Sequence, residues 1–198
     1  MIRVNMVGRP KEFDERQALE QAMTVFWTHG YQATSVQDLL DAMGINRGSM
    51  YDTFGDKHAL FSAAIDHYGR TVTRGLEDTL AGPGSPMANI RKALLSVADQ
   101  VLDRPCRGCM ATNTAIELAQ HDPQAGAAVT NIMQRIEKAF RGALQRSVEA
   151  GELGPQTNTR ALGRFLTGTL QGVVVMGKAS SSRATLRDIV TVALAALQ

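Results

Sequence analysis

Residues 35–54 decide the fold, and they read SVQDLLDAMGINRGSMYDTF. Ser35 and Asn46 are residue types that cap helix N-termini, and Gly44 can adopt the left-handed conformation that ends a helix. The stretch therefore predicts two short helices joined by a tight turn, which is a helix-turn-helix whose second helix fits the major groove of DNA. Apolar residues follow each cap at helical spacing and share a face: Val36, Leu39, Leu40 and Met43, then Met50, Tyr51 and Phe54.

The predicted second helix begins with three residues that suit the reading of base edges. Arg47 can pair with O6 and N7 of a guanine, which is worth roughly 1–3 kcal/mol of discrimination. Gly48 lets the helix approach the bases closely, and Ser49 can contact a base or a phosphate. The sequence therefore predicts double-stranded operator DNA as a partner.

A wider part of the chain, about residues 9–61, resembles the TetR family of bacterial repressors. The resemblance rests on residues 30–36, GYQATSV, and on residues 44–60, GINRGSMYDTFGDKHAL, which carry the family's Gly-aromatic, Thr-Ser-Val, Tyr, Phe and Lys-x-x-Leu positions. It implies that Tyr51 and Lys57 contact DNA phosphates. It also implies a homodimer formed through the last two helices and a small-molecule effector, expected to be apolar, in the C-terminal part.

The charge of the N-terminal part is unusual for a protein that binds DNA. Residues 1–56 hold five basic and eight acidic residues, a net charge of −3, although neutralised phosphates supply most non-specific affinity. We expect the basic residues to line one surface, with neutral donors beside them. The segment with Arg9 and Lys11 is open to two interpretations, an arm in the minor groove or an unstructured leader. Besides residues 47–49, the predicted DNA contacts are Arg9 and Lys11 in this segment and Thr34, Ser35, Tyr51 and Lys57 at phosphates.

The rest of the chain predicts an all-α protein of about nine helices. We expect an N-terminal three-helix DNA-binding domain at 1–56 and an effector-binding and dimerisation domain at 57–198. Gly- and Pro-containing turns and capping residues separate the helices. The expected helices are approximately 14–29, 35–43, 47–54, 57–80, 87–102, 109–120, 123–150, 158–178 and 183–197.

Two sets of C-terminal residues are assigned to ligand and partner. Methionines and other apolar residues suit an adaptable cavity, with two polar side chains to orient a ligand. Small residues on the penultimate helix allow close helix approach, and the last helix has a clean apolar face. The predicted pocket comprises Leu94, Ala98, Met110, Asn113, Ile116, Met133, Ile136, Phe140, Phe165 and Thr169. The predicted dimer interface comprises Gly168, Gly172, Leu186, Ile189, Val190 and Leu194.

Cys106 and Cys109 form a C-x-x-C pattern. A thioredoxin-like site needs a neighbouring strand, and a structural zinc site needs four ligands, so neither is expected. Nearby arginines and a helix N-terminus would lower a thiol pKa, and Gly108-Cys109-Met110 resembles the segment around the sensing cysteine of an electrophile-sensing TetR-family repressor. The alternatives are a thiol-sensing regulator, or a buried small residue at Cys109 and an incidental thiol at Cys106.

The composition favours a globular helical protein. The chain has 198 residues, 44% of them hydrophobic, and only six prolines. We expect a cytoplasmic protein with no membrane partner, because no apolar run is long enough for a signal peptide or a membrane span. We expect no cofactor, metal or enzymatic activity. A small thiol oxidoreductase and a helical interaction module without DNA binding are the competing classes, and the predicted function is a ligand-responsive transcriptional repressor.

Overall fold

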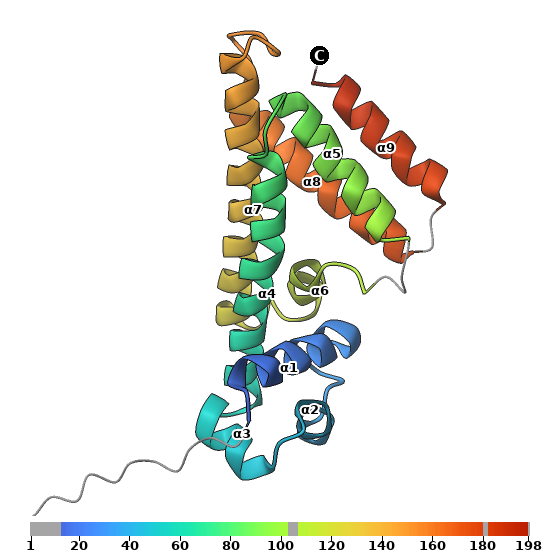
Figure 1. Cartoon of the computed structure of the whole chain (residues 1–198). Helices are drawn as coiled ribbons and strands as arrows, with labels where there is room; N and C mark the ends of the chain where they lie inside the picture. The colour runs from blue at the N-terminus through green and yellow to red at the C-terminus, as the bar shows by residue number, and fades with distance from the viewer. Residues whose placement is uncertain (1–12, 103–106, 180–181, 198) are drawn as a thin grey trace, which may run out of the picture.

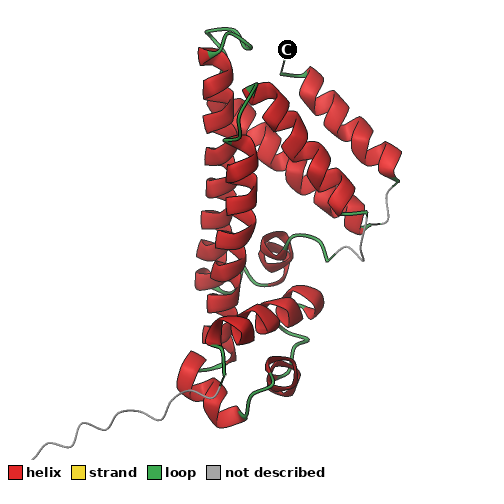
Figure 2. Ribbon diagram, in the orientation of Figure 1, coloured by secondary structure: helices red, strands yellow, loops and turns green. Residues whose placement is uncertain are grey.

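The computed structural model describes residues 13–102, 107–179 and 182–197. These residues form nine α-helices and no strand, so the predicted all-α fold is confirmed (Figure 2). No helix among them has both the length and the apolar character needed to cross a membrane. The helices are α1 Glu15–His29, α2 Val36–Met43, α3 Arg47–Phe54, α4 Lys57–Leu80, α5 Pro86–Gln100, α6 Met110–Glu117, α7 Pro123–Glu149, α8 Thr159–Lys178 and α9 Arg183–Ala195.

The caps predicted from the sequence are present. The Ser35 side chain accepts a hydrogen bond from the Asp38 N–H, and the Asp38 carboxylate accepts one from the Ser35 N–H. The two bonds form a capping box. Asn46 accepts from the Ser49 N–H, and Gly44 ends α2 with φ +65°. These contacts fix where α2 ends and α3 begins. They therefore set the direction of α3, the helix predicted to contact the bases.

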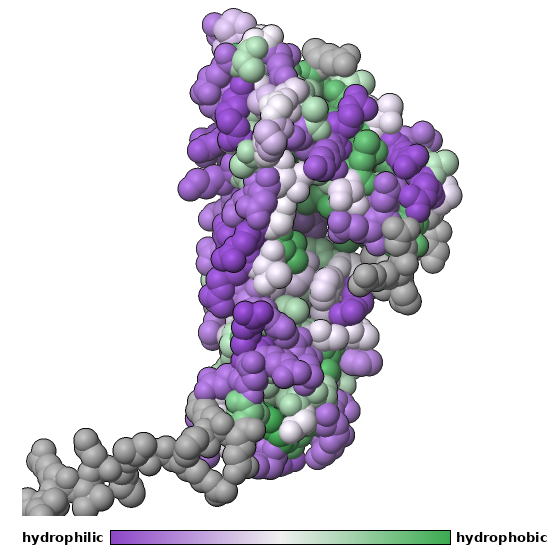
Figure 3. All heavy atoms as spheres, in the orientation of Figure 1, coloured by the Kyte–Doolittle hydropathy of each residue, from purple (hydrophilic) through white to green (hydrophobic). Residues whose placement is uncertain are grey.

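Helices α1–α3 form one end of an elongated molecule (Figure 1). Helix α4 leaves this end and runs beside α7, while α5, α8 and α9 pack together at the other end. The short helix α6 lies between the two ends. In Figure 3, hydrophilic residues cover the α7 edge of the molecule.

The start of α4 belongs to the core of the N-terminal end. The Phe61 ring lies 5.1 Å from the Phe26 ring and 5.0 Å from the Tyr31 ring, measured between centroids. Leu39, Met50 and Leu60 are buried in the same core. The hydrophobic core of the N-terminal end therefore extends past residue 56 into α4, and the domain boundary placed there stays a proposal.

The apolar face of α9 is covered within the subunit. Leu186, Val190 and Leu194 are buried, because α9 packs on α5 and α8. The assignment of these three residues to a dimer interface is therefore wrong for this conformation. Ile189 is half-buried, and Gly168 and Gly172 on α8 are exposed.

Candidate nucleic-acid interface

The leading turn of α3 is open to solvent. Arg47 and Gly48 are exposed, Ser49 is half-buried, and Met50 turns into the core. The Asn46 side chain caps the helix through the Ser49 N–H at 2.8 Å. Residues 47–49 can therefore lie against a partner without disturbing the core behind them.

Tyr51 and Lys57 extend this surface. Tyr51 is 44% exposed, which fits a ring that packs partly and a hydroxyl that remains free. The Lys57 Nζ lies 4.3 Å from the centroid of the Tyr31 ring, a cation–π contact. This contact holds the ammonium group near the start of α4, while Lys57 remains partly exposed.

Thr34 does not belong to this surface. Its side chain is 1% exposed, and its hydroxyl donates to the Gly30 carbonyl at 2.6 Å. The prediction of a phosphate contact at Thr34 is therefore wrong. Ser35 is exposed, but its hydroxyl is engaged with Asp38, and these bonds hold the pKa of the Asp38 carboxyl below its usual value.

Acidic residues of α2 face α1. Asp38 and Asp41 line a hollow together with Val25, His29 and Ala33. Part of the negative charge of the N-terminal end is thus placed beside α1. Arg9 and Lys11 lie outside the described residues, as does Cys106.

The predicted effector residues divide into three groups. The first is packed into the core: Leu94, Ala98, Met110, Ile136 and Phe140. The second is partly buried: Asn113, Met133 and Thr169. The third is open to solvent, with Ile116 82% and Phe165 44% exposed, so these two do not line an enclosed cavity within the subunit.

The two polar residues chosen to orient a ligand have partners inside the chain. Asn113 donates to the Arg107 carbonyl at 3.1 Å and accepts from Lys178 Nζ at 3.2 Å. The Thr169 hydroxyl donates to the Phe165 carbonyl at 3.0 Å. A ligand that used either group would have to displace these bonds.

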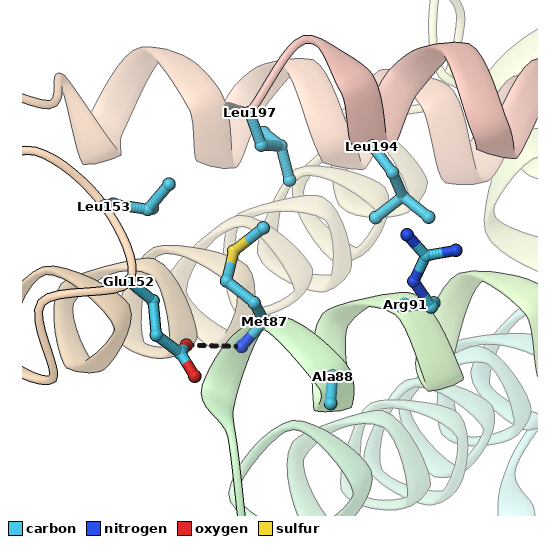
Figure 4. A pocket seen from close by; sticks show the side chains of 7 residues that line it. All are labelled: Met87, Ala88, Arg91, Glu152, Leu153, Leu194 and Leu197. Atoms are coloured by element: carbon cyan, nitrogen blue, oxygen red, sulfur yellow. Dashed lines mark hydrogen bonds between the residues drawn. The ribbon is translucent and has the colours of Figure 1, made fainter.

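A cavity of about 370 Å³, shown close up in Figure 4, lies near the end of α9, at the opposite end of the molecule from α3 in Figure 1. It is formed by the start of α5, the connection between α7 and α8, and the end of α9. Glu152 accepts from the Met87 N–H at 3.0 Å across its edge. The sequence did not reveal this cavity, because its walls come from three distant segments. The lining residues are Met87, Ala88, Arg91, Glu152, Leu153, Leu194 and Leu197.

Cys109 is a buried free cysteine. It precedes the first residue of α6, and the Tyr68 hydroxyl donates to its Sγ at 3.4 Å. Burial, with Cys109 as a further contributor, raises the pKa of Tyr68. The Arg107 guanidinium lies over the Trp27 ring. Since redox-sensor cysteines are usually accessible, these surroundings favour the interpretation of Cys109 as a core residue.

A polar pair that the sequence analysis missed joins α4 to the start of α7. His58 Nε2 lies 2.7 Å from Asp122 Oδ2. Asp122 also caps α7 by accepting from the N–H groups of Gln124 and Ala125. The Asp122-Pro123 dipeptide predicts the N-cap role of Asp122. The sequence does not predict its pairing with His58, which is 64 residues away.

Two family models match the chain. The model for bacterial regulatory proteins of the tetR family matches residues 18–64, and the model for a tetracyclin repressor-like C-terminal domain matches residues 86–193. The chain belongs to the TetR family. It is therefore a helix-turn-helix transcriptional regulator, and the predicted family and function are confirmed.

Several TetR-family relatives match over most of their length. The chain is 35% identical to YezE, an uncharacterized HTH-type transcriptional regulator of Bacillus subtilis (strain 168), over 96% of this chain and 100% of the relative. It is 29% identical to the transcriptional repressor ComR of Escherichia coli (strain K12), over 92% of this chain and 88% of ComR. Both relatives are named as regulators of transcription.

A solved structure shows a TetR-family neighbour on DNA. It contains a cysteine mutant of the regulator CifR complexed with 26-bp double-strand operator DNA. The TM-score is 0.83 at 30% identity, and the match covers 96% of this chain and 100% of that chain.

Proposed function

We propose that this TetR-family regulator binds its operator as a homodimer, with the leading turn of α3 from each subunit in a major groove, and that a small molecule releases it. The observation that carries the proposal is the exposed turn with Arg47 and Gly48, set on a helix whose other face is fixed in the core by Met50. Two such helices related by two-fold symmetry read two half-sites about one helical turn apart.

An exposed apolar stripe on α8 supports the dimer. Phe165 and Val175 are 44% and 47% exposed, and Met176 is also exposed. Gly168 and Gly172 lie on the same stripe, and a Cβ built on either would meet no atom within 4 Å. Val192 adds an exposed apolar side chain on α9. Exposed apolar side chains gathered along one helix face favour an interface, and the glycines would let a second helix approach closely.

The effector site is proposed for the domain formed by α5–α8. Its interior is apolar, with Met110 and Phe140 buried and Met133 beside them. Since Leu94, Met110 and Phe140 are buried by their neighbours, an apolar effector that reaches them would bind a second state, in which those neighbours are displaced. Such a ligand releases DNA only by its difference in affinity between the two states.

The test is selection of duplexes from a random-sequence DNA library by the full chain. We expect a two-fold symmetric sequence to be enriched, bound by two subunits as measured by analytical ultracentrifugation of the complex. Enrichment of no sequence would contradict the proposal. Binding of one subunit per selected duplex would contradict its dimeric part.

A further inference from the structure

The last residue of α6 is bonded to the connection between α1 and α2. Glu117 Oε1 accepts a hydrogen bond from the Gln32 N–H at 2.8 Å, and Oε2 accepts one from the Tyr31 N–H at 3.0 Å. The residues joined are 85 and 86 positions apart in the sequence. One carboxylate thus satisfies two consecutive backbone donors, and hydrogen bonds to a charged acceptor are stronger than neutral ones.

The connection that Glu117 holds leads directly into the helix-turn-helix. It runs from the end of α1 to Ser35, the N-cap of α2. Gly30 has φ +82°, and a Cβ added there would lie 2.8 Å from Glu117 Oε2. Glycine at position 30 therefore serves both the turn and the close approach of the carboxylate.

A second contact ties the other end of α6 to α1. The Trp27 Nε1–H donates to the Gly108 carbonyl at 3.0 Å, two residues before α6 begins. Helix α6 is in turn bonded to α8, because the Thr112 hydroxyl donates to Gln171 Oε1 at 2.7 Å. A continuous set of bonds therefore runs from α8 through α6 to the segment before α2.

We infer that Glu117 is a positioning residue for specific DNA binding. Its carboxylate fixes the connection before α2 against α6, and with it the orientation of α3 relative to the rest of the subunit. The inference rests on the proposed function, since it concerns how the reading helices are presented. Binding to two half-sites requires both helices at the operator's spacing, whereas non-specific binding to phosphates does not.

The experiment compares Glu117→Ala, Glu117→Gln and the control Glu149→Ala, an exposed glutamate at the end of α7. Affinity is measured for the duplex selected by the wild type and for a random-sequence duplex. Amide hydrogen exchange at Tyr31 and Gln32 and the thermal midpoint are measured in parallel. In Glu117→Ala we expect about tenfold weaker binding to the selected duplex, with little change on random DNA and faster exchange at both amides.

Glu117→Gln keeps one acceptor oxygen, so its affinity should lie between wild type and Glu117→Ala, and this variant decides the matter if the alanine variant does not fold. Wild-type affinity and exchange in both variants would overturn the inference. Equal losses on selected and random DNA would also overturn it, since they would show a general structural role. If the wild type selects no duplex, the proposed function fails, and exchange at Tyr31 and Gln32 still decides whether Glu117 holds the connection.

Discussion

The hydroxyl of Thr34 donates to the carbonyl of Gly30 at 2.6 Å and closes the turn between α1 and α2 from the inside. The carboxylate of Glu117 binds the same turn by accepting hydrogen bonds from the Tyr31 and Gln32 N–H groups. Thr34 therefore acts within the fold of the DNA-binding end rather than on DNA.

Replacing Thr34 by valine should lower the free energy of unfolding by about 1 kcal/mol, because a buried hydrogen bond is lost at nearly constant volume. Urea-induced unfolding measures this change. The affinity of folded Thr34→Val for the selected duplex at fixed salt should stay that of the wild type. Weaker binding by the folded variant would restore Thr34 as a phosphate contact.

Lys57→Ala, in contrast to Thr34→Val, should change DNA binding more than it changes stability. If the Lys57 ammonium neutralises one phosphate per subunit, the slope of log affinity against log salt should fall by about 0.9 per contact. The free energy of unfolding should fall by no more than about 1 kcal/mol, since the cation–π contact with the Tyr31 ring is partly exposed. Fluorescence anisotropy over a salt series gives the slope, and an unchanged slope would exclude Lys57 from the contacts.

Arg47→Ala should weaken binding to the selected duplex by about 1–3 kcal/mol for each half-site and relax the preference at one base pair. Repeating the selection with the variant identifies that base pair. Arg91→Ala, at the cavity far from α3, removes the same charge and serves as the control. Equal effects of both substitutions would show that Arg47 contributes only charge.

Val175→Glu should separate the subunits. Each copy would place a carboxylate in the apolar stripe on α8, and an unpaired buried charge costs several kcal/mol, which corresponds to an increase of about a hundredfold or more in the dimer dissociation constant. Sedimentation equilibrium measures it, with Lys138→Glu on the exposed side of α7 as the control. A dimer of wild-type strength in Val175→Glu would exclude this stripe as the interface.

Asp122 should contribute to stability in a pH-dependent way. Hydrogen bonds from the Ala125 N–H and from His58 lower the pKa of its carboxyl below the ordinary value of 3.8. A group with a lowered pKa contributes stability that is complete above its unfolded pKa and is lost as the pH falls through the folded value. Asp122→Asn keeps a capping acceptor but removes the charge.

The unfolding free energy of Asp122→Asn should therefore depend less on pH than that of wild type between about pH 2 and pH 5. Asp78→Asn, which alters an exposed carboxylate on α4, is the control. Parallel pH profiles for wild type and Asp122→Asn would refute the role assigned to the pair with His58.

The local elements were predictable because their signals are local. Ser35, Gly44 and Asn46 act on neighbours within a few residues, and their sequence pattern therefore determines where α2 and α3 lie. The apolar face of α9 was misassigned to the dimer interface. An amphipathic sequence predicts that the apolar face is buried, but it does not show whether the same chain or a second subunit buries it. Glu117 looks like any acidic residue at a helix end until the fold brings Tyr31 beside it.

Helix α4 is continuous from the DNA-binding end into the rest of the subunit, which restricts where DNA-binding domains can be exchanged between this regulator and others. Its first turns supply Phe61 to the core around Phe26, and the Tyr68 ring still meets Trp27 at 5.0 Å. A chimera joined at residue 56 would lack the part of α4 that completes the hydrophobic core of the transferred DNA-binding domain. A working graft must carry the chain at least through Tyr68 and must receive a carboxylate equivalent to that of Glu117 from its new host.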